Sequence, residues 1–131
     1  MPLNLRRHRY PPSHADIAPT AAACAAIRDI VEHAVVPAFK VDAATLRRPT
    51  RGPAGAARAR QIAMYLAHVV AGLTLSDVGR VFGRDRTTVA HACMIVEDGR
   101  DDPRLDRALD VIEAVIRRVL AVAAGMPRST V

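Results

Sequence analysis

The stretch ARQIAMYLAHVVAGLTLSDVGRVFGRDRTTVAHAC, residues 59–93, decides how this chain folds. Apolar residues recur three and four positions apart through its first part and predict a helix over about 57–71, followed by Gly72 as a left-handed C-cap. The second part predicts a short helix over 76–82, a turn, and a further helix from the N-cap Asp85 to about residue 98. Two helices joined by so tight a turn are typical of a helix-turn-helix.

The amino end of the second of these helices carries side chains suited to reading DNA bases. Helical spacing turns Val89, Ala92, Cys93 and Val96 inward and leaves Arg86, Thr87, Ala90 and Met94 outward. In a helix-turn-helix this helix enters the major groove, and its first residues meet base edges. Asp85 can accept a hydrogen bond from cytosine, Arg86 can hold guanine through two, and the Thr87 methyl suits thymine. An exposed D-R-T-T is also an ordinary polar start for a surface helix, so on chemistry alone both interpretations stay open.

Composition favours a single all-α domain. The chain has 131 residues, of which 50% are hydrophobic and only 3% aromatic, so its core is expected to be aliphatic and built of packed helices. We assign residues 20–125 to the domain, 1–19 to an irregular or disordered arm with four prolines, and 126–131 to a flexible tail.

Further helices are predicted on both sides of the central stretch. Upstream, Thr20 is a candidate N-cap for a helix that Pro37 should kink or end, and Asp42 is a candidate cap for a short helical turn. Downstream, Asp102 caps a long helix that turns a leucine and isoleucine stripe inward and ends at Gly125.

The positive charge is concentrated in the first half of the chain. The net charge is +6, and residues 1–60 hold ten basic and four acidic residues, whereas the two signs balance in the remainder. Five arginines follow one another there with no acid between them: Arg47, Arg48, Arg51, Arg58 and Arg60. Such a stretch suits a phosphate backbone. Prolines and glycines interrupt it and prevent one amphipathic helix, which places nucleic acid ahead of a membrane surface.

Other classes of function find little support. Two cysteines are too few for a disulfide framework, and Cys93 is expected to act as a small apolar residue. His91 and Cys93 are two apart and do not share a helix face, so neither metal nor cofactor is expected. Glu97 fits a cap or a solvated face better than an acid–base pair, and no enzyme is expected. Without an apolar leader or span, we expect a soluble, cytoplasmic, nucleoid-associated protein.

The wider string resembles the C-terminal DNA-binding domain of the bacterial replication initiator DnaA. The resemblance rests on R-Q-x-A-M-Y-L, D-V-G-R-x-F-G, R-D-x-T-T-V and H-A-C within 60–93, and on FKVDAATLRR at 39–48, which is similar to the family's short helix and basic loop. It covers residues 25–120. It implies an all-α, compact helical bundle of the Trp-repressor-like kind that contains a helix-turn-helix. It also implies sequence-specific binding of double-stranded DNA in the control of replication initiation or transcription.

Site residues follow from the resemblance position by position. It implies base contacts from Asp85, Arg86 and Thr87, and minor-groove entry by a basic-loop arginine that matches Arg51 best, with Arg47 and Arg48 as rivals. It implies phosphate contacts from Arg60, Gln61, Leu75, Ser76, Thr88 and His91, to which the basic stretch adds Arg47, Arg48 and Arg58.

The sequence departs from the family pattern in the turn and in one base reader. The family usually has two glycines before the R-D pair and a histidine where this chain has Arg86, so the turn is one residue shorter and the preferred DNA site is open. The ATPase loop G-x-x-x-x-G-K-[ST] is absent, so no nucleotide is expected, and a reader that competes, marks or regulates is indicated. The alternative is a protein-interaction module that acts on a replication initiator or its regulators without reading bases.

Overall fold

The computed structural model describes residues 19–41, 44 and 54–125. Its elements are five helices, with no strand among the described residues: α1 (Ala21–Phe39), α3 (Ala54–Val69), α4 (Leu75–Phe82), α5 (Arg86–Gly99) and α6 (Pro103–Gly125). The predicted all-α class is confirmed. The predicted arm, tail and Asp42 turn lie almost wholly outside the described residues.

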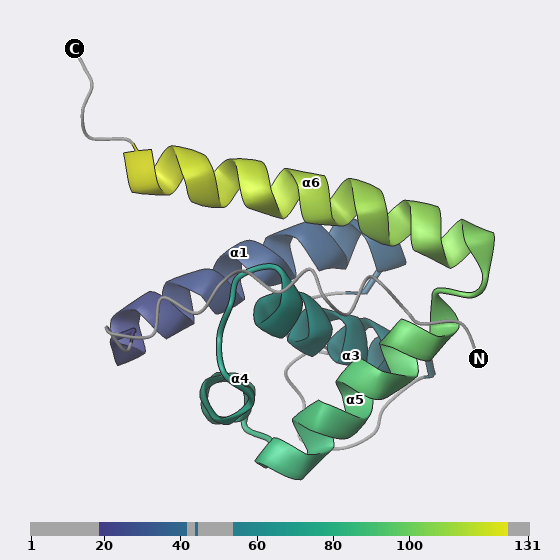
Figure 1. The fold of residues 1–131 in the computed structure, drawn as a ribbon, viewed down its shortest axis with the longest axis horizontal. Coiled ribbons are helices and arrows are strands. Elements are labelled where there is room, and N and C mark those ends of the chain that lie inside the picture. Colours follow the sequence, from purple (N-terminus) through teal and green to yellow (C-terminus); the bar gives the residue numbers. More distant parts are fainter. Residues whose placement is uncertain (1–18, 42–43, 45–53, 126–131) are drawn as a thin grey trace.

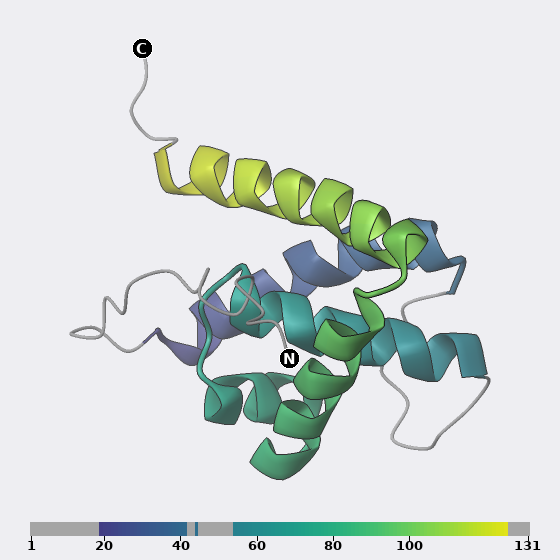
Figure 2. The same ribbon diagram turned by 45° about the vertical axis from the view of Figure 1, so that its right-hand side comes forward.

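The helices pack around α3. This helix contacts α1, α4 and α5, while α6 packs on α1. Figure 1 shows α6 lying along α1 at the upper side of the molecule, with α4 and the amino end of α5 at the lower side. Figure 2, turned by 45°, keeps the same separation. The amino end of α5 is therefore opposite the face covered by α6.

Burial of α3 goes beyond its predicted apolar face. Every side chain from Ile62 to Ala67 is buried, so the helix is enclosed all round rather than along one stripe. Small residues such as Ala59, Ala63 and Ala67 allow neighbouring helices to approach closely. The core formed in this way is aliphatic, as the composition predicts.

The helix ends follow local capping chemistry. The Oγ1 atoms of Thr20 and Thr74 accept hydrogen bonds from Ala23 and Asp77 N–H, each at 3.0 Å. Gly72 has φ +81° just after α3, as its predicted role requires. Pro37 does not end α1, which continues for two more residues to Phe39 although the proline N cannot donate an intrahelical hydrogen bond.

A buried charged cluster ties α6 to α3 and α5. Arg100, the C-cap of α5, is only 3% exposed and donates hydrogen bonds to Asp106 at 2.7 Å, to Asp110 at 2.6 Å and to Glu113. It also donates to the hydroxyl of Tyr65 at 3.0 Å. Burial disfavours its charge, but the hydrogen bonds to Glu113, Asp106 and the Tyr65 hydroxyl outweigh that effect and raise the pKa of Arg100.

The structure corrects the prediction that Glu97 lies at a cap or on a solvated face. It is buried, not capping or solvated, and its Oε2 accepts a 2.8 Å hydrogen bond from the Tyr65 hydroxyl. The prediction was wrong because the partner lies 32 residues away, on α3. Across the described ranges, no helix is both long enough and apolar enough to cross a bilayer.

Candidate nucleic-acid interface

The amino end of α5 is fixed by its N-cap. Asp85 Oδ1 accepts a 2.8 Å hydrogen bond from Thr88 N–H, and the cap leaves Arg86 and Thr87 exposed in the first turn. Hydrogen bonds from Thr88 hold the pKa of the Asp85 carboxyl below its ordinary value. The Asp85 carboxylate is therefore ionised at neutral pH. Its stabilising contribution to the start of α5 is lost only as the pH falls through that lowered pKa. The expected outward orientation of Arg86 and Thr87 is confirmed.

The turn between α4 and α5 closes through a close backbone approach. Arg84 N–H donates a 2.9 Å hydrogen bond to the Gly79 carbonyl, and a Cβ at Gly79 would lie 2.5 Å from the Arg84 carbonyl oxygen. Gly83 ends α4 in the left-handed region, with φ +68°. One glycine in the turn and one inside α4 thus allow the two helices to come close together.

Substituting Gly79 tests this closure. Gly79→Ala is expected to lower the free energy of unfolding by about 1–3 kcal/mol, because its Cβ meets backbone rather than a movable side chain. Gly83→Asn is the matched control: nothing lies within 4 Å of its Cβ and asparagine tolerates the left-handed region, so it should have the smaller effect. Thermal unfolding followed by circular dichroism measures both. Equal losses would contradict the close approach.

Two arginines meet beside this turn. Arg84 Nη1 donates to the carbonyls of Phe82 and Gly83, at 3.3 and 3.2 Å, where its charge complements the carboxyl end of α4. Arg60, on α3, is 7% exposed, and burial together with the nearby positive charge of Arg84 lowers its pKa. An anion at this point would relieve the repulsion between the two guanidinium groups. Sequence reasoning missed Arg84, although its place beside Asp85 was a signal.

The amino end of α4 offers a second set of donors. Leu75 and Ser76 are its first residues, half-buried and exposed respectively, and first-turn N–H groups have no acceptor within their own helix. Such N–H groups suit phosphate oxygens. On α5, Thr88 and His91 are exposed one turn apart, and Gln61 on α3 is half-buried.

The structure separates other predicted phosphate contacts from this group. Arg58 is exposed, but its Nη2 lies beside Gly99, 3.3 Å from the position of a Cβ there. Gly99 ends α5, about 20 Å along the helix from Arg86 at 1.5 Å per residue. Arg47, Arg48 and Arg51 lie outside the described residues.

The cysteines take structural positions. Cys24 is fully buried, and Cys93 packs against the core as a half-buried residue. Burial, followed by the charge of Glu97, raises the pKa of Cys93 to about 12, so its thiol stays protonated at neutral pH. A protonated thiol is a poor nucleophile, in keeping with the predicted apolar role.

Comparison with known proteins gives one family and a set of partial relatives. The family model described as bacterial DnaA protein helix-turn-helix matches residues 28–96. The chain is 45% identical over 67 residues to proteins named chromosomal replication initiator protein DnaA from Ralstonia nicotianae and Burkholderia multivorans, a match that covers 50% of this chain and 13% of theirs. The Paraburkholderia xenovorans protein of that name is equally similar, with 12% of its length matched. The matched region runs from α1 to α5 and excludes α6.

Proposed function

Because the chain belongs to the bacterial DnaA helix-turn-helix family, we propose that it binds double-stranded DNA in a sequence-specific manner through the amino end of α5. The observation that carries this proposal is the exposure of Arg86 and Thr87 at a helix start that Asp85 holds in place. In a helix-turn-helix, side chains at this position meet base edges in the major groove.

Each of the three residues has a distinct role in the proposal. Arg86 holds guanine through two hydrogen bonds, and the Thr87 methyl contacts thymine. Asp85 is already engaged by Thr88, so it acts first by fixing the helix start and then as an acceptor toward a cytosine amino group.

Phosphates on either side of the groove set the register. The donors proposed for these phosphates are the first N–H groups of α4, the exposed Thr88 and His91, and the arginine pair Arg60 and Arg84. Arg58 contacts a phosphate at the far end of α5. The basic-loop arginine, best matched by Arg51, enters the adjacent minor groove.

The names of the relatives support a proposal for the biological role. Those proteins are named as replication initiators. We therefore propose that the chain occupies DNA sites and thereby controls replication initiation or transcription.

Selection from a random duplex pool tests the proposal. The full chain is expected to enrich one site, and binding to that site should fall steeply as salt rises, because neutralised phosphates release counterions. Absence of an enriched site, together with no binding at low salt, would overturn the proposal in favour of a protein-interaction module.

A further inference from the structure

The outer face of α6 carries an apolar stripe that the fold leaves uncovered. Val111, Val115, Val119 and Val122 are 64%, 49%, 41% and 59% exposed. Their spacing of four, four and three residues aligns them along one side of the helix. The internal packing of α6 uses a neighbouring line, Leu109, Ile112 and Ile116, which is buried. The stripe lies beside this buried line, and two of its members, Val115 and Val119, also line the junction with α1.

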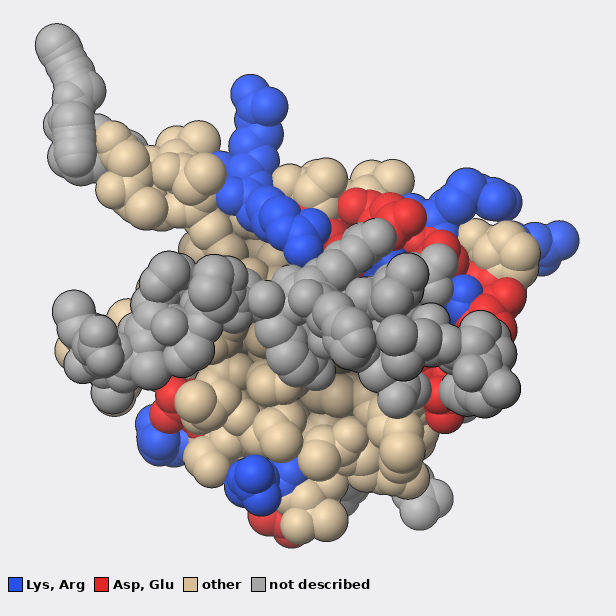
Figure 3. Space-filling model, in the orientation of Figure 1, with Lys and Arg blue, Asp and Glu red and all other residues tan. Residues whose placement is uncertain are grey.

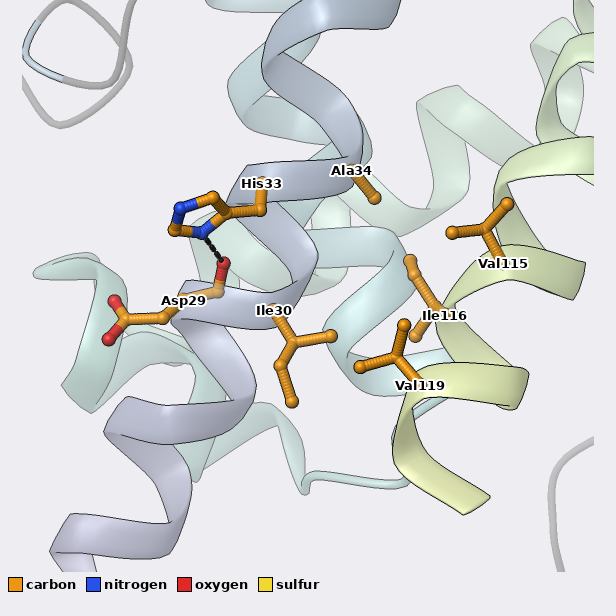
Figure 4. Close-up of a pocket in the computed structure, with 7 residues that line it drawn as sticks. All are labelled: Asp29, Ile30, His33, Ala34, Val115, Ile116 and Val119. Atoms are coloured by element: carbon orange, nitrogen blue, oxygen red, sulfur yellow. Dashed lines mark hydrogen bonds between the residues drawn. The ribbon is translucent and has the colours of Figure 1, made fainter. Parts of the chain in front are cut away.

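Beside the stripe, α1 and α6 enclose an apolar cleft of about 410 Å³. Figure 4 shows Ile30 and Ala34 of α1 facing Val115, Ile116 and Val119 of α6 across it. His33 and Asp29 also line the cleft, and His33 Nδ1–H donates to the Asp29 carbonyl at 2.7 Å. A cleft of this size can accept bulky apolar side chains. With the stripe it forms one surface, which we call the α1/α6 surface.

The exposed charges beside the valine stripe on α6 are basic, whereas Asp29 of α1 lines the cleft itself. All three acids of α6, at positions 106, 110 and 113, turn toward Arg100. Arg104, Arg107 and Arg118 are exposed, and none of them pairs with an acid in the part of the chain that the structure describes. Figure 3 shows basic side chains projecting from α6 along the upper edge of the molecule. Helical spacing sets Arg107 and Arg118, eleven residues apart, on one line beside the valines.

We propose that the α1/α6 surface docks an amphipathic helix of another protein, one that carries acidic residues along one edge. Its apolar side chains would fill the cleft and cover the valine stripe, and its carboxylates would face Arg107 and Arg118. Helix-in-groove binding of this kind uses apolar anchors at three- and four-residue spacing, and flanking charges select the partner.

Charge argues against the two occupants that this chain itself could supply. Residues 1–19 contain three arginines and a single acid, Asp16, so their sign matches that of the exposed arginines of α6. A second copy would bring the same arginines: in an antiparallel pair of α6 helices about a two-fold axis, both arginine edges fall on the same side. An acidic partner removes both conflicts.

The position of the surface makes it compatible with DNA binding. It lies on the side opposite the amino end of α5 (Figures 1 and 2), and α6 is outside the region that the family model matches. A partner bound there leaves Arg86 and Thr87 uncovered. Partner docking and DNA binding can therefore be tested independently of each other.

A designed peptide tests the docking. The probe is a fluorescein-labelled amphipathic helix with leucines at i, i+4, i+7 and i+11 and glutamates along one edge; a scrambled peptide of equal composition is its control. Fluorescence anisotropy with the full chain, at about 0.15 M salt to screen distant charges, is expected to show binding of the amphipathic peptide only. Val115→Ser should weaken binding fivefold or more, with an unchanged circular dichroism spectrum to show that the fold is kept.

Charge reversal supplies the matched pair. Arg118→Glu should also weaken binding of the acidic peptide fivefold or more. A peptide with lysines in place of the glutamates should restore binding to this variant. Arg86→Glu, which makes the same change of charge at the other end of the molecule, should leave peptide binding unchanged. Equal binding of scrambled and amphipathic peptides, no binding of either, or a dimer in sedimentation that Val115→Ser dissociates would overturn the proposal. Site selection on the Val115→Ser chain tests DNA reading independently.

Discussion

Replacing Arg100 by methionine is expected to lower the free energy of unfolding by about 3–5 kcal/mol. The guanidinium group is buried and is the shared partner of Asp106, Asp110 and Glu113, so its removal leaves the almost fully buried Glu113 without its main counter-charge. The substitution also removes the hydrogen bond that Arg100 donates to the Tyr65 hydroxyl, and it loosens the contact between α5 and α6. Unfolding in urea, followed by circular dichroism, measures the loss.

Arg117→Met is the matched control. Arg117 contacts the same carboxylate, Glu113, at 3.5 Å, but from the exposed side of α6. Exposed pairs contribute about 0–1 kcal/mol, so this change should be nearly neutral. Adding Glu113→Gln to Arg100→Met should recover part of the loss, because no buried charge then remains at position 113. If the two methionine variants unfold at the same urea concentration, the cluster does not hold α6 in place.

Replacing Arg86 by alanine is expected to reduce discrimination between the selected DNA site and its single-base variants at one position. One good bidentate contact is worth about 1–3 kcal/mol, or about 5- to 150-fold in relative affinity. The reason is positional: Arg86 is exposed at the start of α5, directly after the cap that orients it. Affinities for the selected duplex and its variants, measured by anisotropy at fixed salt, give the ratio.

Arg58→Ala removes the same charge from an exposed position near the other end of α5. It should weaken all duplexes alike and make the salt dependence shallower by about one phosphate contact, without changing their order. An unchanged order of duplexes for Arg86→Ala would remove Arg86 from the readers. Changed order for Arg58→Ala would mean that α5 lies in the groove along its whole length.

Sequence reasoning succeeded where the deciding interactions are local. The caps Thr20 and Asp85, the glycine after α3 and the inward line of α5 were all predicted and are all confirmed. The helix boundaries differ by at most three residues, as at the start of α3. For the site, the exposure of Arg86 and Thr87 followed from helical spacing alone. Their contacts with DNA remain predictions.

Prediction from the sequence failed where a residue's main interaction partner is distant in the chain. The sequence predicts Glu97 as a surface acid, but in the structure it accepts a hydrogen bond from Tyr65, which in turn accepts one from Arg100. Arg58 and Arg60 belong to one basic stretch, yet one reaches Gly99 and the other lies near Arg84. Positions two apart on a helix point in nearly opposite directions, so a count of charges cannot say which arginines act together.

By itself, the amino-acid sequence determined where most helices begin and end and which side chains head α5, since caps and helical spacing act within about four residues. Only the tertiary structure decided that α3 is enclosed all round, that Arg100 draws the acids of α6 inward, and that the outer face of α6 is left apolar and basic. These features depend on how helices pack across long stretches of chain, and no short segment contains that information.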